Sequence, residues 1–128
     1  MKKIFKRSLT SLLASSIGFS PFLSIKADTA PDITWTKLLG SGSSKRAFGN
    51  DISTEIDGSI YVVGYTDGNL GGELNSGNQD AFLTKFSSDG IKAWTKLLGS
   101  EHSEYGRGVA TSSDGSIYIT GITWGDLD

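Results

Sequence analysis

The sequence of 128 residues contains no cysteine, and His102 is its only histidine. Without cysteine the fold has no disulfide and depends on packing alone, and no lipid-modified cysteine can tether the chain to a membrane. A metal site built from histidine and thiolate ligands is excluded, and a serine–histidine–aspartate triad would have only His102 as its base. His102 lies in a loop rich in glycine, serine and glutamate, which favours a solvated side chain. The residue types therefore indicate neither a catalytic centre nor a metal or cofactor site.

Helical periodicity is also missing, because no window of helical length repeats apolar residues every 3.6 positions. Short runs rich in β-branched and aromatic residues predict strands instead. These runs are 51–57, 58–66, 80–88 and 91–98. Asp-Gly pairs, which favour the tight turns between antiparallel strands, occur at 57–58, 89–90 and 114–115. The mature chain is therefore predicted to be all-β, with antiparallel hairpins.

The first residues have the order of parts of a secretory signal peptide. An apolar stretch without acidic residues follows the basic residues within 2–7, and a polar segment begins after Ala27. A transmembrane anchor is the alternative, but the apolar stretch is shorter than the ~20 residues that a span needs, and serines dilute it. The sequence predicts a signal peptide over 1–27 and a linker over 28–32. We therefore expect an exported protein, secreted, periplasmic or at the cell surface, that does not insert into the membrane after cleavage.

Negative charge dominates once this segment is removed. The full chain carries 12 basic and 14 acidic residues, but five of the basic residues and no acidic residue lie in 1–27. The mature net charge is about −7, which disfavours nucleic acids and anionic membrane surfaces as partners. In the simplest interpretation the acidic surface serves solubility.

Two sequence blocks recur in the same order along the chain. The block Thr-Trp-Thr-Lys-Leu-Leu-Gly-Ser at 34–41 recurs almost unchanged at 93–100, and Asp-Gly-Ser-Ile-Tyr at 57–61 recurs at 114–118. The first pair is displaced by 59 positions and the second by 57, so a two-residue length difference lies between them. Such self-similarity indicates a tandem repeat architecture.

One repeat is interpreted as a four-stranded antiparallel unit whose second strand is apolar on both faces. In this strand Ile60 and Val62 point to one side, and Tyr61, Val63 and Tyr65 point to the other. A sheet with one face in water would alternate apolar and polar residues, so this sheet must be covered on both sides. Small sheets stacked around an axis meet this condition, as in the blades of a β-propeller.

The longest matching strings resemble the SBBP β-propeller repeat. The stretch 80–99, with Asp-Ala-Phe-Leu-Thr-Lys-Phe and Ser-Asp-Gly, resembles one half of that repeat, and the stretch 105–123, with Gly-Ser-Ile-Tyr-Ile-Thr-Gly, resembles the other. The resemblance covers nearly all of 33–124. It implies a bladed β-propeller in an exported bacterial or archaeal protein, and it implies no reaction.

The chain holds only about one and a half repeats of such a ring. We expect an outer strand over 33–39, a full blade over about 51–98 and a partial blade over about 108–124, within a repeat region that spans 33–128. A closed propeller needs about six to eight blades, and repeats bury their faces only against neighbours. At least one face of each sheet is therefore expected to lack a partner within the chain, which favours self-association or a marginal fold.

Three tryptophans are candidates for ligand contacts, since aromatic faces suit carbohydrate rings. Trp35 and Trp94 occupy the same repeat position, which indicates packing between blades. Trp124 is different, because its counterpart in the first repeat is Asp67 and because it follows the end of a predicted strand. Trp124 is therefore the candidate ligand-binding residue.

The loop between the second and third strands offers a weaker alternative. It carries a set of carboxylate and amide side chains that could ligate calcium, namely Asp67, Asn69, Glu73, Asn75, Asn78 and Asp80. Their spacing matches no EF-hand, and Asn or Asp beside Gly more often forms turns. We therefore expect no metal site in this loop.

The interpretation that fits these features is an exported, non-enzymatic binding or interaction module of the cell envelope or the secreted fraction. Its ligand would be an unknown protein or a carbohydrate, and no cofactor is expected. A truncated remnant of a longer propeller without independent function is one alternative, and a short propeller lectin that oligomerises to close its ring is another. The sequence shows no pair of placed carboxylates, which a glycosidase would need.

Overall fold

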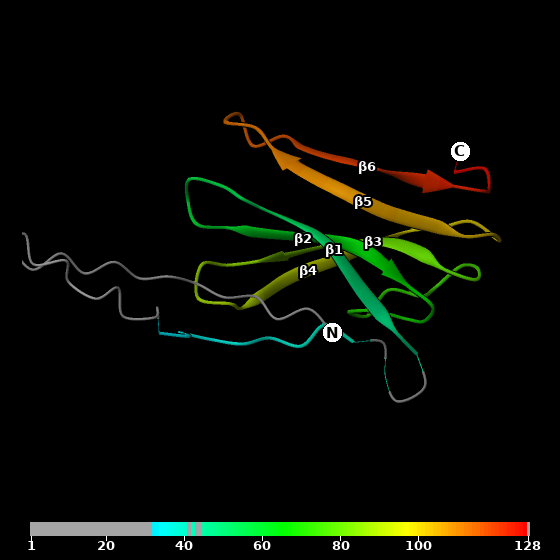
Figure 1. The fold of residues 1–128 in the computed structure, drawn as a ribbon, viewed down its shortest axis with the longest axis horizontal. Helices are drawn as coiled ribbons and strands as arrows, with labels where there is room; N and C mark the ends of the chain where they lie inside the picture. The colour runs from blue at the N-terminus through cyan, green and yellow to red at the C-terminus, as the bar shows by residue number, and fades with distance from the viewer. Residues whose placement is uncertain (1–31, 41, 43–44, 128) are drawn as a thin grey trace, which may run out of the picture.

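The computed structural model describes residues 32–40, 42 and 45–127, and this part of the chain consists of strands and loops without a helix (Figure 1). The six strands are, in order, β1 (Ala47–Thr54), β2 (Ile60–Thr66), β3 (Asp80–Phe86), β4 (Lys92–Leu98), β5 (Glu104–Thr111) and β6 (Ile117–Thr123). The all-β prediction is confirmed for these residues. None of them belongs to a helix that could cross a membrane. The predicted signal peptide, 1–27, and the linker up to residue 31 lie outside the described residues.

The strands form a four-stranded antiparallel meander, β1-β2-β3-β4, and a separate two-stranded hairpin, β5-β6. β1 begins at Ala47 rather than at the predicted residue 51, because 47–49 pair with the end of β2. The register shifts between Gly49 and Asp51, as it does at a β-bulge, and the bulge interrupts the alternation by which a strand is recognised. The same shift lies within β5, which starts four residues before the predicted partial blade.

All three Asp-Gly pairs lie at hairpin turns, as predicted. Gly58, Gly90 and Gly115 have φ angles of 81°, 80° and 83°, in the left-handed region that glycine adopts without strain. The aspartate before the first turn glycine, Asp57, accepts a hydrogen bond of 2.7 Å from the backbone N–H of Ser59. This bond holds the pKa of Asp57 below its ordinary value, and Asp114 has the same arrangement with the N–H of Ser116.

Both faces of the β1–β4 sheet are covered. On one face, four buried side chains of β2 and β3 form a cluster with Leu70, and the partly buried Trp35 and Leu39 pack against it. The four are Ile60, Val62, Phe82 and Phe86. On the other face, Tyr61, Val63 and Leu83 meet Val109 of β5. The expectation that this sheet would lack a partner on one face is therefore wrong, because the segment before β1 covers one face and β5 covers the other. The strand β6, in contrast, is exposed along nearly its whole length.

The predicted outer strand over 33–39 has no strand pairing in the structure, although the backbone of this segment runs extended below the sheet (cyan in Figure 1). A strand needs the N–H and C=O groups of a neighbouring strand, and no described strand lies beside this segment. Side-chain packing holds it instead. The Trp35 Nε1–H donates to the backbone oxygen of Ser88 at 3.3 Å, and a Cβ on Gly90 would lie 2.6 Å from the indole ring.

Trp35 and Trp94 both pack against the sheet, as predicted for a repeated position. They do so on opposite faces: Trp35 contacts the cluster around Phe82, and Trp94 contacts the cluster around Tyr61. The Trp94 and Tyr61 rings are tilted, with centroids 6.1 Å apart. A repeated tryptophan thus contributes to packing on each side of one blade-like sheet.

Candidate functional site

A continuous row of four aromatic rings crosses from the β1–β4 sheet to the β5–β6 hairpin. Phe48 and Tyr65 are stacked with centroids 4.9 Å apart, and Tyr65 meets the edge of Tyr105 at 4.7 Å. Tyr105 in turn meets Trp124 at 5.5 Å, with the two ring planes nearly perpendicular. These separations are those of attractive aromatic pairs. We call these four side chains the aromatic row.

Strand register explains why the rings meet. Phe48 lies directly opposite Tyr65 in the β1–β2 ladder, and Tyr105 occupies in β5 the repeat position that Phe48 occupies in β1. The step between the two sheets, from Tyr65 to Tyr105, depends on close backbone approach. A Cβ on Gly106 would lie 2.6 Å from a methyl group of Val63, so glycine is what allows β5 to come this near.

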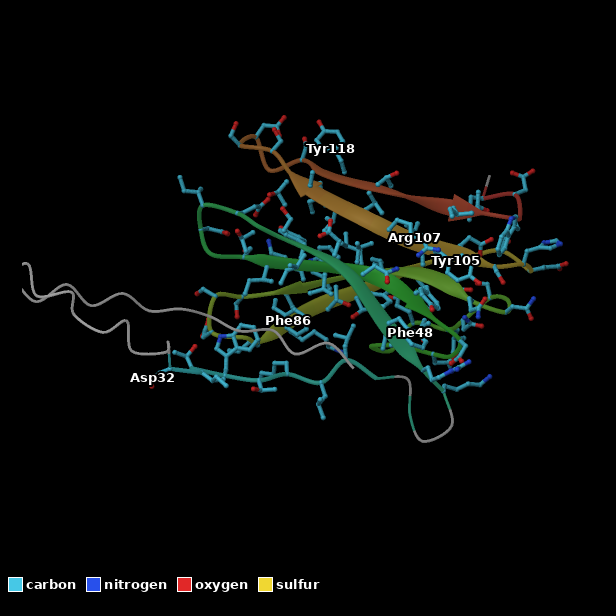
Figure 2. All side chains as sticks on the ribbon, viewed as in Figure 1. Asp32, Phe48, Phe86, Tyr105, Arg107 and Tyr118 are labelled. Carbon is cyan, nitrogen blue, oxygen red and sulfur yellow. The ribbon has the colours of Figure 1, made fainter. Side chains whose placement is uncertain are left out.

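Two arginines flank the aromatic row. The guanidinium carbon of Arg46 lies 5.7 Å from the centroid of Phe48, and that of Arg107 lies 5.4 Å from the centroid of Tyr105. These are cation–π distances. Figure 2 shows Phe48, Tyr105 and Arg107 in the same half of the molecule. Arg46 also pairs with the carboxylate of Asp67 at 3.1 Å, and its backbone N–H lowers the pKa of that carboxyl. Phe48 and Trp124, at the two ends of the row, are exposed, whereas Tyr65 and Tyr105 between them are partly buried. The row therefore combines partly exposed aromatic surface with nearby guanidinium groups.

Trp124, the residue singled out from the sequence, stands at one end of this row and is 67% exposed. Its backbone N–H donates to the oxygen of Ser103 at 3.2 Å, just as the N–H of Asp67 donates to the oxygen of Arg46 at 3.1 Å. The two residues are thus structural counterparts, as their sequence positions indicate. Sequence reasoning missed the other three members of the row.

A shallow hollow of about 230 Å³ adjoins the row on the hairpin. Tyr105 and Ile122 line it together with Leu98 from β4 and Leu127 beyond β6. Its lining is predominantly apolar, and Glu104 and Thr123 supply polar groups. The hollow extends the apolar surface of Tyr105 toward the end of the described chain.

Two buried carboxylates lie where the chain passes from the sheet to the hairpin. Asp80 accepts the N–H of Ser76 at 2.9 Å, and Glu104 accepts the N–H of Ser100 at 2.8 Å. The second oxygen of Asp80, Oδ1, has no hydrogen-bond partner in the described structure. Burial raises the pKa of Asp80 and the charge of Glu104 adds to the rise, whereas the N–H groups of Ser76 and Gly77 oppose it. Each carboxylate thus fixes the loop beside it at this junction.

The remaining candidates do not come together as a site. His102 is an exposed loop residue. In the oxygen-rich loop, Asp67 pairs with Arg46, and Glu73 pairs with Lys96 at 3.0 Å. Within the described residues there is no group of three or more His, Cys, Asp or Glu side chains that could hold a metal ion.

Comparison with known proteins agrees with the repeat seen in the sequence and in the strand registers. The β-propeller repeat known as SBBP matches residues 34–71 and 93–128. The chain is also 28% identical over 118 residues to the regulatory protein FlaEY of Caulobacter vibrioides. That alignment covers 86% of this chain but only 12% of the relative. Because the two matched stretches make up more than half of the sequence, the chain belongs to the SBBP β-propeller repeat family.

Proposed function

We propose that this chain is an exported, non-enzymatic part of a β-propeller that binds a carbohydrate on the aromatic row. The observation that carries the proposal is the continuity of Phe48, Tyr65, Tyr105 and Trp124 across two sheets, with an arginine at either side. Exposed aromatic rings offer flat apolar faces to the C–H faces of sugar rings, and clusters of such rings are common in binding surfaces.

The charges near the row indicate which sugars suit it. Arg46 and Arg107 lie beside aromatic rings of the row on a chain whose predicted mature form is acidic. Arg46 already pairs with Asp67, so Arg107 is the arginine that we assign to an acidic ligand. Guanidinium groups donate paired hydrogen bonds to carboxylates, and they also donate hydrogen bonds to hydroxyl oxygens. An oligosaccharide with acidic units therefore matches this surface better than a cationic ligand does.

Export is the second part of the proposal, and it rests on the basic and apolar segments of 1–27. The expected result is that material recovered from the extracytoplasmic fraction begins at or near Asp28. N-terminal sequencing measures this directly. An intact Met1 in that fraction would contradict cleavage, and recovery only from the cytoplasm would contradict export.

Replacing Trp124 with alanine is expected to weaken binding of an acidic oligosaccharide by about tenfold or more, since tryptophan is enriched among the few residues that dominate binding, whose truncation costs about 2 kcal/mol or more. Isothermal titration calorimetry against a panel of neutral and acidic oligosaccharides measures the affinity without relying on tryptophan emission. The matched control is Ile91→Ala, because Ile91 is 63% exposed and lies in the β3–β4 turn, at the opposite end of the sheet from Tyr65.

Two results would contradict the carbohydrate proposal. One is that no oligosaccharide in the panel binds the unaltered chain. The other is that Trp124→Ala and Ile91→Ala have equal effects on affinity, since the aromatic row would then play no part in recognition.

A further inference from the structure

A hollow of about 430 Å³ lies between the β1–β2 turn and the β5–β6 turn. Residues 54–57 line it from the first turn, and residues 111–113 with Gly115 line it from the second. Figure 1 shows both turns at the same end of the molecule, on the left, whereas the aromatic row lies at the other end of the same strands. Both walls of the hollow thus come from hairpins that are complete in the structure.

Two hydrogen bonds hold the walls of the hollow together. The Thr111 hydroxyl donates to the backbone oxygen of Thr54 at 3.1 Å, and the hydroxyls of Ser53 and Thr111 are 3.0 Å apart. A hydroxyl has only one proton to donate, so Ser53 is the donor in the second bond. These bonds join the end of β1 to the end of β5, and the packing of the two sheets therefore forms the hollow in advance of any ligand.

The two walls differ in chemistry although they are repeat counterparts. Glu55 and Ile56 of the first turn occupy the positions at which the second turn has Ser112 and Ser113. The Ile56 side chain is fully exposed. Neither turn contains a lysine or an arginine. The hollow therefore offers a carboxylate and an apolar side chain on one wall and hydroxyl groups on the other.

The carboxylate of Glu55 is held through one of its oxygens. Glu55 Oε2 accepts a hydrogen bond of 3.1 Å from the Tyr61 hydroxyl, whereas the buried Oε1 has no hydrogen-bond partner in the described part of the chain. A buried acceptor without a donor is unfavourable, so a ligand that brings a donor is favoured. Lys85 lies beside this network, with its ammonium 5.1 Å from the centroid of the Tyr61 ring, but it does not line the hollow. Asp57 adds a second carboxylate to the lining, so the hollow is negatively charged.

We propose that this hollow binds a lysine or arginine side chain from a basic segment of a partner protein. The cationic group donates hydrogen bonds to the Glu55 carboxylate, and the methylene groups of the side chain pack against Ile56. Charge complementarity extends beyond the hollow, because the mature chain is predicted to carry a net charge of about −7 and attracts a basic segment over a longer range. The hollow is separate from the aromatic row, so one chain can hold a sugar and a basic partner at the same time.

A fluorescently labelled tetra-arginine peptide tests this proposal, with fluorescence anisotropy as the measurement. Saturable binding to the unaltered chain is expected, and a peptide with uncharged citrulline in place of arginine is expected not to bind. Glu55→Gln is expected to weaken binding about tenfold, because it removes the charge that faces the ligand. The matched control is Glu101→Gln, which removes the same charge from an exposed loop at the other end of the strands and is expected to change the affinity by less than about twofold.

A change on the opposite wall makes the test independent of Glu55. Ser113→Lys adds a cation to the lining and is expected to weaken binding at least as much as Glu55→Gln does. An unaltered chain that does not bind the arginine peptide overturns the proposal. Equal losses in Glu55→Gln and Glu101→Gln also overturn it, since net charge and not the hollow then attracts the peptide. If Glu55→Gln loses its melting transition, Ser113→Lys decides the question, and an unchanged affinity in that variant overturns the proposal.

Discussion

Gly64→Ala is expected to lower the free energy of unfolding by about 3 kcal/mol or more, which is the upper range for overpacking in a core. Gly64 is a buried residue of β2, and a Cβ built on it would overlap the backbone oxygen of Phe48 in β1. The same Cβ would lie 2.9 Å from the ring of Phe82 in β3. Neither neighbour can yield freely, since one is the backbone of the paired strand and the other is a core side chain. The overlap between the added Cβ and the backbone of Phe48 can therefore be removed only by moving β1 away from β2.

Urea denaturation followed by circular dichroism measures this change. The matched control is Gly40→Ala, because a Cβ on Gly40 meets no atom within 4 Å and this glycine does not have a positive φ angle. Replacing glycine with alanine makes the unfolded chain less flexible, which by itself stabilises the fold, so Gly40→Ala is expected to cause no loss. Equal losses in the two variants would contradict the close approach of β1 as the cause.

Phe82→Ala is expected to reduce the free energy of unfolding by about 3–5 kcal/mol, the usual cost of removing a buried phenylalanine. Phe82 is 1% exposed and lies in the cluster with Val62 and Phe86, beneath the segment that carries Trp35. Small domains are stable by only about 5–15 kcal/mol, so this single change removes a large part of the total.

Thermal melting in parallel with urea denaturation checks the Phe82 prediction. The control is Ile56→Ala, at a turn side chain that is fully exposed, where the expected change is within about 0.5 kcal/mol. A parent chain without a cooperative transition would contradict the expectation of a packed core, and so would equal changes in the two variants.

Much of the fold follows from local patterns in the sequence. The Asp-Gly pairs predict three hairpin turns, because only glycine adopts the left-handed φ there at no cost. Burial on both faces of β2 is predictable because Tyr61 and Val62 are apolar neighbours that point to opposite sides. The start of β1 cannot be predicted in this way, since the bulge between Gly49 and Asp51 breaks the alternation that marks a strand. The segment 33–39 repeats the sequence of β4, but β4 is a strand because it pairs with β3. The segment 33–39 has no neighbouring strand to pair with among the described residues.

The candidate site was predictable only in part. Trp124 could be singled out because the equivalent position of the first repeat holds Asp67. Such a difference between two repeats is visible within a single sequence. Phe48 lies between the predicted strands 33–39 and 51–57, where no alternating pattern marks it, and the pattern of 58–66 places Tyr65 only on an apolar face of a blade. The meeting of Tyr65 with Tyr105 joins two sheets over 40 positions of sequence, and close approach at Gly106 makes it possible. No local pattern encodes such a contact.

The junction between the β1–β4 sheet and the β5–β6 hairpin responds to acid in the opposite direction from the Asp57 and Asp114 turns at the other end of the strands. Because the folded pKa of Asp80 is raised, its contribution to stability is full below the unfolded pKa and is lost as pH rises through the folded value. Because the folded pKa values of Asp57 and Asp114 are lowered by N–H donors, their contributions are present above the unfolded pKa and are lost as pH falls through the folded values. Acidification therefore strengthens the junction between sheet and hairpin while it weakens the turns at the far end. Lowering the pH therefore shifts stability away from the hairpin turns of both sheets and toward the junction between them.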